Sequence, residues 1–282
     1  MTVYPFAIHL GPLELTGYGL MMMVAFLMAG WAIQLDLRAR GLDEDYAADI
    51  IIAGVIGGLI GAKLWYVSLG HPDMLFRRGG FVWYGGFLGA TAGILLNGWR
   101  RRVPARFTAE ICAAPLALGY ALGRVGCFLV NDDYGIPTGL PWGMKFPKGL
   151  PETTVGELQR MGVHFPALTD PNTLVAVHPT QIYETIAMLC VFWWLWRRRD
   201  HGHAIGWLCA CYLVFGGMER FLVEFVRAKD DRLLGMFSLA QAMSVLLVLV
   251  GGLLMLKWRV PAGPQPLPES LRPKQVPVRG SA

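Results

Sequence analysis

Three basic residues lie inside the apolar stretches of this chain, namely Lys63, Arg124 and Arg220. A charge in such surroundings is costly unless something pairs with it, so it marks a functional site by default. An arginine binds phosphate through two parallel, charge-assisted hydrogen bonds, and a lysine binds it as a point charge. The three cations therefore indicate an anion site, and a phosphate is the ligand that suits them best.

Acidic residues accompany two of these cations. Arg220, Glu224 and Arg227 are spaced i, i+4 and i+7, so one helix face would present plus, minus and plus. Asp132 follows Arg124 in a stretch rich in glycine and proline. A structural ion pair of either arginine with Glu224 or Asp132, or snorkelling of the long side chains to the interface, is the simpler alternative. The residue types alone leave both interpretations open.

The composition is typical of a polytopic membrane protein. Of the 282 residues, 54% are hydrophobic and 16% charged, and the mean hydropathy is +0.44. The net charge of +5 does not indicate nucleic acid, because the basic residues form short clusters between apolar runs. The five cysteines form no CxxC pair, so neither a disulfide framework nor a metal site is predicted.

Apolar runs long enough to cross about 30 Å of hydrocarbon recur along the chain and predict an all-α fold of about seven transmembrane helices. Short loops rich in lysine and arginine stay in the cytoplasm, and this rule predicts an N-terminus on the outer side of the membrane and a cytoplasmic C-terminus. The expected spans are 18–37, 47–69, 82–99, 107–129, 179–196, 203–224 and 234–257.

This topology gives each polar residue of the spans a depth. Lys63, Arg124, Arg220 and Glu224 come late in spans that run outward, and Tyr18, Tyr84 and Glu184 come early in spans that run inward. All of them fall in the outer half of the membrane, whereas an ion pathway would need polar groups through its whole thickness. The pattern predicts a polar chamber open to the outer leaflet, with a phospholipid head group as its ligand.

Two segments lie outside the spans. Residues 130–178 form the longest loop, and their proline, glycine and tryptophan content predicts a compact cap on the outer face of the membrane. The domain at 1–258 is then the integral membrane part, and the proline-rich residues 259–282 are expected to be a disordered cytoplasmic tail. Glycines recur at three- and four-residue intervals within 54–61 and 85–93, which predicts closely packed helices.

Ordered motifs then carry a resemblance over nearly all of residues 1 to 256. The chain resembles the bacterial prolipoprotein diacylglyceryl transferase family. The matching pieces are Tyr18-Gly19-Leu20, Gly61-Ala62-Lys63-Leu64, Tyr84-Gly85-Gly86, Gly123-Arg124-x-Gly126, Tyr134-Gly135, Leu140-Pro141-Trp142-Gly143, His178-Pro179-Thr180-Gln181-Ile182-Tyr183-Glu184, Arg220-x-x-x-Glu224-Phe225-x-Arg227, and Ser238 with Gln241.

The resemblance implies a reaction at the outer face of the bacterial inner membrane. The diacylglyceryl group of phosphatidylglycerol passes to the lipobox cysteine thiol in the signal peptide of a prolipoprotein, a thioether forms and glycerol 1-phosphate leaves, without cofactor or metal. The implied partners are membrane lipid and the prolipoprotein, and no nucleic acid. The implied catalytic residues are Arg124, Arg220, Glu224 and Tyr84. The implied phosphatidylglycerol-binding residues are Arg124, Arg220, Lys63, Tyr18, Arg227 and Asp132.

The chain departs from the family pattern at four positions around these residues. The family has asparagine at the places of Cys127 and Val130, glutamate at that of Asp132, and a histidine, proposed as the base, at that of Tyr84. A tyrosine has a pKa near 10 and needs nearby cations to act as a base. The alternative to a transferase is therefore a non-catalytic or retuned paralogue that binds phosphatidylglycerol or handles lipoproteins.

Overall fold

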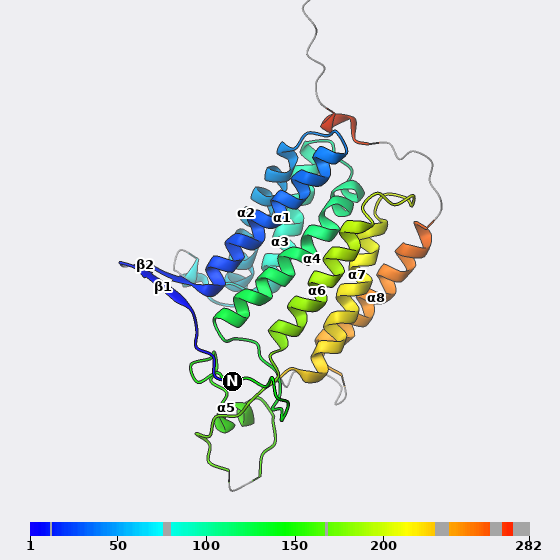
Figure 1. The fold of residues 1–282 in the computed structure, drawn as a ribbon. Coiled ribbons are helices and arrows are strands. Elements are labelled where there is room, and N and C mark those ends of the chain that lie inside the picture. Colours follow the sequence, from blue (N-terminus) through cyan, green and yellow to red (C-terminus); the bar gives the residue numbers. More distant parts are fainter. Residues whose placement is uncertain (12, 76–79, 167–168, 229–236, 260–266, 273–282) are drawn as a thin grey trace, which may run out of the picture. The chain divides into compact units, whose positions relative to one another are not determined.

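The computed structural model describes residues 1–11, 13–75, 80–166, 169–228, 237–259 and 267–272 (Figure 1). These residues are mostly helical, and each expected span coincides with one long helix. The long helices are α1 (Gly17–Ala39), α2 (Asp45–Ser68), α3 (Trp83–Arg100), α4 (Ala105–Leu129), α6 (Thr180–Arg197), α7 (Trp207–Val223) and α8 (Leu239–Lys257).

Two of the expected helix starts differ from the observed ones by more than two residues. Helix α7 begins at Trp207, four residues later than expected, because Gly206 has a left-handed φ of +100° that cannot continue a helix. The backbone N–H of Gly206 donates instead to the Glu110 carboxylate at 2.7 Å. Helix α8 begins after Ser238, whose side chain and that of Gln241 form a capping box. Residues 234–236 of the last expected span lie outside the described residues.

Four helices are long and apolar enough to cross a membrane by length and composition, namely α1, α2, α4 and α8. Helices α3 and α6, of 18 residues each, carry more polar residues, and α7 has 17 residues. Large aliphatic side chains along the apolar helices are more than half exposed, for example Ile56 at 53% and Leu253 at 69%. Such exposure is typical of a lipid-facing surface, so the protein is a mostly helical, multi-pass membrane protein.

The chain divides by its internal contacts into two compact units, and the boundaries fall within α1 and α4. Unit 1 comprises Met1–Met28, Ala113–His203 and Trp207–Val260, and unit 2 comprises Ala29–Cys112, Ala204–Gly206 and Pro261–Ala282.

Unit 1 holds the later helices side by side (Figure 1). Helix α7 packs against both α6 and α8. Ala117 of α4, Met188 and Leu195 of α6 and Cys211 of α7 belong to one buried hydrophobic cluster. The contact with α8 is close at Gly217, where a Cβ would lie 2.9 Å from the Ser244 carbonyl oxygen. These contacts fix the positions of side chains on the facing sides of α4, α6 and α7.

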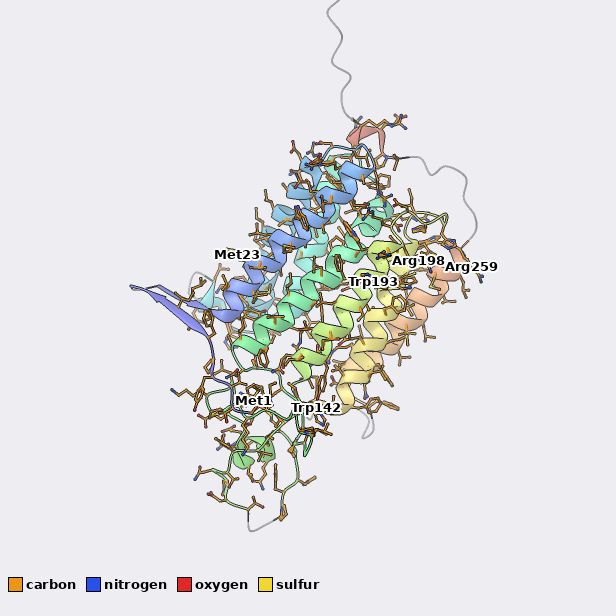
Figure 2. All side chains as sticks on the ribbon, viewed as in Figure 1. Met1, Met23, Trp142, Trp193, Arg198 and Arg259 are labelled. Carbon is orange, nitrogen blue, oxygen red and sulfur yellow. The ribbon has the colours of Figure 1, made fainter. Side chains whose placement is uncertain are left out.

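Residues 130–178, between α4 and α6, fold around their own small core. Tyr134 stacks on Phe146, with ring centroids 5.6 Å apart, and the short helix α5 (Val155–Arg160) contributes the fully buried Leu158. Figure 2 shows Trp142 of this segment and Met1 at the same end of unit 1, and Arg198 and Arg259 at its other end. The segment is thus ordered and compact within the described residues.

The N-terminal residues form structure that the sequence analysis does not predict. Strands β1 (Ala7–Leu10) and β2 (Leu13–Thr16) pair as an antiparallel hairpin directly before α1. Upstream of the hairpin, the N-terminal ammonium donates to the Gly143 carbonyl oxygen at 3.2 Å, and the backbone of Val3 pairs with that of Lys145. The all-α prediction is therefore corrected by one small hairpin.

In unit 2, glycines allow α2 and α3 to pack backbone against backbone, as their spacing predicts. A Cβ on Gly57 would meet the Gly89 carbonyl oxygen, and one on Gly61 would meet the Gly85 carbonyl oxygen. Larger residues at these positions would force the helices apart.

The expected disorder of the tail is wrong for residues 267–272, and the other residues from 260 to 282 lie outside the described ones. A single 3-10 turn, Glu269–Leu271, places the Leu271 side chain in the core of unit 2, where it is fully buried. The Leu271 carbonyl oxygen accepts a 2.7 Å hydrogen bond from the Asp43 backbone N–H. Burial of Leu271, packing of Leu267 on the same core and the hydrogen bond from Asp43 together favour order in this stretch.

Candidate active site

The turn after α4 determines what Arg124 can reach. The helix ends at Leu129, and Asn131 and Asp133 then take left-handed φ values of +59° and +61°, which asparagine and aspartate adopt more readily than most residues. The backbone N–H of Asp132 bonds back to the carbonyl oxygen of Cys127 at 3.0 Å. The chain therefore folds back over the end of the helix and brings the Asp133 carboxylate to Arg124.

The Arg124 guanidinium is buried and held by two carboxylates. Its Nη2 donates to Glu184 Oε1 at 2.6 Å, and its Nη1 donates to Asp133 Oδ2 at 3.0 Å. The same Nη1 lies 3.5 Å from the Cys127 sulfur. Arg124 is 8% exposed and Glu184 only 1%. This is a buried ion pair with additional hydrogen bonds, the arrangement that a buried charge requires.

Further hydrogen bonds, from Tyr120 of α4 and from the first turn of α6, hold Glu184 and the turn that carries Asp133 in place. The Tyr120 hydroxyl donates to the second carboxylate oxygen of Glu184 at 2.6 Å. The Thr180 hydroxyl donates to the Asp133 carbonyl oxygen at 2.8 Å, and the Gln181 amide donates to that of Asp132 at 2.6 Å. The turn carrying Asp133 is therefore fixed to the helix that carries Glu184.

Asp133 links Arg124 to the end of α7. Its other oxygen, Oδ1, accepts from Arg227 Nη2 at 2.7 Å. Arg227 Nη1 lies 4.0 Å from Glu224 Oε2, and the same oxygen lies 2.7 Å from Arg220 Nη2. The helical spacing of plus, minus and plus is thus confirmed, although α7 ends at Val223 and Glu224–Val226 is a 3-10 turn.

Together these contacts form an alternating chain of charges. Its members in order are Glu184, Arg124, Asp133, Arg227, Glu224 and Arg220. Two buried donors of the chain, Arg124 Nε and Arg220 Nη1, have no hydrogen-bond partner in the described part of the protein. Because buried donors are costly when unpaired, these two are suited to an anionic ligand.

Of the ion pairs that the sequence analysis left open, that of Arg220 with Glu224 is confirmed, whereas a pairing of Arg124 with Asp132 or Glu224 is wrong. The carboxylates that bind Arg124 are Asp133 and Glu184, since the left-handed turn presents residue 133 to the helix end. Burial and the neighbouring Asp133 raise the pKa of the Asp132 carboxyl above its ordinary value. Asp132 instead lines a pocket of about 350 Å³ together with Asp133, Tyr134, Pro151, Arg160, Met161, Arg227 and Ala228.

Three of the sequence-predicted residues are not members of the alternating chain of charges. Tyr18, in the first turn of α1, is 44% exposed and interacts electrostatically with Arg124. Lys63 and Tyr84 belong to unit 2, where the Lys63 ammonium lies 5.1 Å from the ring centroid of Phe81 and Tyr84 is half exposed in the first turn of α3. The roles of these residues in the site stay predictions.

Glu184, Asp133 and Tyr120 are the site residues that sequence reasoning does not single out. Glu184 is among the polar residues placed in the outer half of the membrane, but its partner Arg124 is sixty residues away in the chain. Tyr120 lies one helical turn before Arg124, and a tyrosine near the end of a membrane span is common at the membrane–water interface and gives no sign of a functional role. Among the described residues, no group of three or more His, Cys, Asp or Glu side chains is arranged to hold a metal ion.

Comparisons with known proteins agree with the motifs. Residues 5–257 match the family described as prolipoprotein diacylglyceryl transferase. A phosphatidylglycerol–prolipoprotein diacylglyceryl transferase of Paraburkholderia phymatum is 33% identical, with 90% of this chain and 92% of the relative covered. The proteins of the same name from Cupriavidus metallidurans and Burkholderia mallei are 32% and 31% identical, again with 90% of this chain covered and with 92% and 94% of the relatives. The chain belongs to the prolipoprotein diacylglyceryl transferase family.

Proposed function

We propose that this protein transfers the diacylglyceryl group of phosphatidylglycerol to the lipobox cysteine thiol of prolipoproteins, and so catalyses the first step of lipoprotein maturation. Relatives named for this activity match this chain over almost their full length. The observation that carries the proposal for this chain is the pair of buried, unpaired donors on Arg124 and Arg220. A phosphate of the lipid would satisfy both.

The reaction needs a sulfur nucleophile, an electrophilic glyceryl carbon and stabilisation of the charge that develops on the leaving phosphate. Arginine donors already fixed in position stabilise such charge without reorganising during the reaction. Arg124 is fixed by Glu184 and Asp133, and Arg220 by Glu224. In this proposal Arg124 and Arg220 bind the phosphate, and the carboxylates hold the two guanidinium planes.

The remaining predicted residues complete the proposed site. Tyr18, Lys63, Arg227 and Asp132 would bind the lipid head group. Tyr84, at the position of the histidine proposed as the family's base, would act on the thiol proton. A thiol with a pKa near 8.5 needs only modest help to ionise.

The proposed membrane arrangement has seven helices crossing the bacterial inner membrane, with the N-terminus in the periplasm and the C-terminus in the cytoplasm. Clusters of arginine at the ends of α1, α3 and α6 support this orientation. Residues 130–178 would then cap the periplasmic face, where the signal peptide of a prolipoprotein presents its cysteine. Phosphatidylglycerol would enter from the outer leaflet.

Purified protein in phosphatidylglycerol vesicles with a synthetic lipobox peptide tests the proposal. Mass spectrometry should detect one diacylglyceryl group on the peptide thiol, and glycerol 1-phosphate should appear in equal amount. A peptide with serine in place of the cysteine is the control and should stay unmodified. Well-folded protein that binds the lipid but modifies no thiol would reject the transferase and favour a lipid-binding paralogue.

A further inference from the structure

A fourth carboxyl group lies beside the alternating chain of charges and has no ion-pair partner in it. Glu219 precedes Arg220 in α7, and its Oε1 is buried without a hydrogen-bond partner among the described residues. The proposed transfer, as described so far, gives this side chain no role. A carboxyl oxygen that is buried without a partner in a membrane helix is costly and makes its residue a functional candidate by default.

Helical periodicity places Glu219 on the face of α7 that packs against α4 and α6. Phe215 and Tyr212 precede it by four and seven residues, and both pack in the hydrophobic cluster that α4, α6 and α7 share. Phe215 meets Trp194 of α6 edge to face, with ring centroids 5.0 Å apart. Glu219 continues this face one turn further along the helix.

The position along the helices brings Glu219 level with Glu184. Glu184 is the fifth residue of α6 and Glu219 the fifth from the end of α7, and these two consecutive helices pack against each other. Glu219 accordingly interacts electrostatically with Glu184 and Arg124, and also with Arg220 and Arg227.

The titratable and charged groups around Glu219 come from three sides. Helix α4 contributes Tyr120 and Arg124, α6 contributes Glu184, and α7 and its end contribute Tyr212, Arg220 and Arg227. Helix α8, which also packs on α7, has its basic residue Lys257 in its last turn and no acidic residue in its first.

The charge balance of the site decides the state of Glu219. Arg124, Arg227 and Arg220 are matched by Glu184, Asp133 and Glu224, so the alternating chain is neutral. Ionised Glu219 would add an unpaired negative charge beside Glu184 in the place where a lipid phosphate must bind. Two carboxyl groups that share a buried site keep one proton between them, and Glu184 is the one that Arg124 holds ionised.

We propose that Glu219 is held protonated beside the alternating chain and supplies its proton to the leaving phosphate in each turnover. This inference rests on the proposed transferase function. The C–S bond forms between the thiol sulfur and the glyceryl carbon, the C–O bond to phosphate breaks, and its electron pair stays on the phosphate oxygen. The proton of Glu219 neutralises that oxygen, and the thiol proton then restores Glu219, so the net effect moves the thiol proton to glycerol 1-phosphate.

Glu219→Gln tests the protonation state independently of turnover, because an amide replaces a protonated carboxyl atom for atom. The variant is expected to melt at or above the temperature of the unmodified protein and to bind phosphatidylglycerol vesicles equally well. A lower melting temperature would show that the fold holds the ionised form and would overturn the proposal. Glu110→Gln is the control, since Glu110 is a buried carboxyl of α4 that already has a partner, the backbone N–H of Gly206 in unit 2.

The pH profile of transfer tests the proton itself. Removing a general acid typically costs about 10²–10⁴-fold in rate, so Glu219→Gln should be slower by at least about tenfold. If Glu219 supplies the proton, a fall in transfer rate with rising pH should be present in the unmodified protein and in Glu110→Gln and absent from Glu219→Gln. Transfer by Glu219→Gln at the unmodified rate and with the unmodified profile would overturn the proposal. Absence of transfer in the unmodified protein would instead reject the transferase function and leave the melting comparison to decide the state of Glu219.

Discussion

Arg124→Lys keeps the positive charge of the site and removes its two-armed geometry. In the protein the two terminal nitrogens of Arg124 contact different carboxylates, Glu184 at 2.6 Å and Asp133 at 3.0 Å. A lysine ammonium is a single point and cannot hold two carboxylates in the same orientation. We therefore expect Arg124→Lys to lose one of these contacts and to lose the orientation that the proposed phosphate site needs.

The expected magnitudes separate the effect on stability from that on activity. A hydrogen bond to a charged group contributes about 1.5–3 kcal/mol, which sets the expected loss of stability for Arg124→Lys. Arg124→Ala leaves Glu184, which is 1% exposed, without its cation. Breaking a buried pair in this way costs about 3–5 kcal/mol. Both variants should lose at least about 10²-fold in transfer rate, the usual effect of losing one fixed donor to developing charge.

Thermal unfolding in detergent and transfer to a lipobox peptide, measured on the same preparations, test these expected losses of stability and of transfer rate. Adding Glu184→Gln to Arg124→Ala should restore stability without restoring transfer, because it removes the buried charge that the alanine leaves unpaired. Arg38→Lys is the control, since the Arg38 side chain is 62% exposed and its ion pair with Glu44 lies at the surface. Unchanged melting and transfer in Arg124→Lys would refute the two-armed geometry.

Three further variants test the fold and the turn. Leu271→Ala should lower the free energy of unfolding by about 2–5 kcal/mol, because it empties a fully buried position; the shift in melting temperature measures it. Gly61→Ala should cost about 1–3 kcal/mol in the same assay, because its Cβ meets the Gly85 carbonyl oxygen. Asp132→Asn should raise the melting temperature near pH 7 and change it little below about pH 4. The raised pKa of Asp132 means that the folded protein holds this proton more tightly than the unfolded chain, so the stability it contributes is lost as pH rises through the folded pKa.

One control variant and two contrary results make these experiments informative. Gly252→Ala places a Cβ where nothing lies within 4 Å, so it should leave the melting temperature unchanged or raise it slightly. If Leu271→Ala unfolds like the unmodified protein, the turn at 269–271 does not stabilise unit 2. A pH-independent effect of Asp132→Asn would contradict the raised pKa.

Helices are the part of this fold that the sequence predicts best, because an apolar run of about 20 residues has few alternatives to a membrane helix. The start of α7 is the exception, since it depends on the left-handed Gly206. Residues 7–16 form a hairpin too short to leave a periodic signal. The order at 267–272 depends on Leu271 inserting into a core formed by distant residues.

The site is predictable only as far as its local spacing. Arg220, Glu224 and Arg227 are close in sequence, and helical geometry alone brings them together. The pairing of Arg124 with Glu184 needs the packing of α4 against α6, which no spacing reveals. The choice of Asp133 over Asp132 depends on two left-handed residues, and a shift of one residue in that turn would exchange their positions.

The same turn explains how this chain accommodates cysteine at position 127, where the resemblance described under Sequence analysis implies asparagine. Arg124 Nη1 lies 3.5 Å from the sulfur of Cys127, a weak acceptor, and 3.0 Å from Asp133 Oδ2, a strong one. An asparagine at 127 would offer an amide oxygen to this nitrogen, and here the Asp133 carboxylate supplies the acceptor instead. Because Asp133 also accepts a hydrogen bond from Arg227, this one carboxylate links Arg124 to the end of α7. Asp133→Asn should therefore weaken both arginines together, whereas Cys127→Ala should leave the pairing of Arg124 with Glu184 in place.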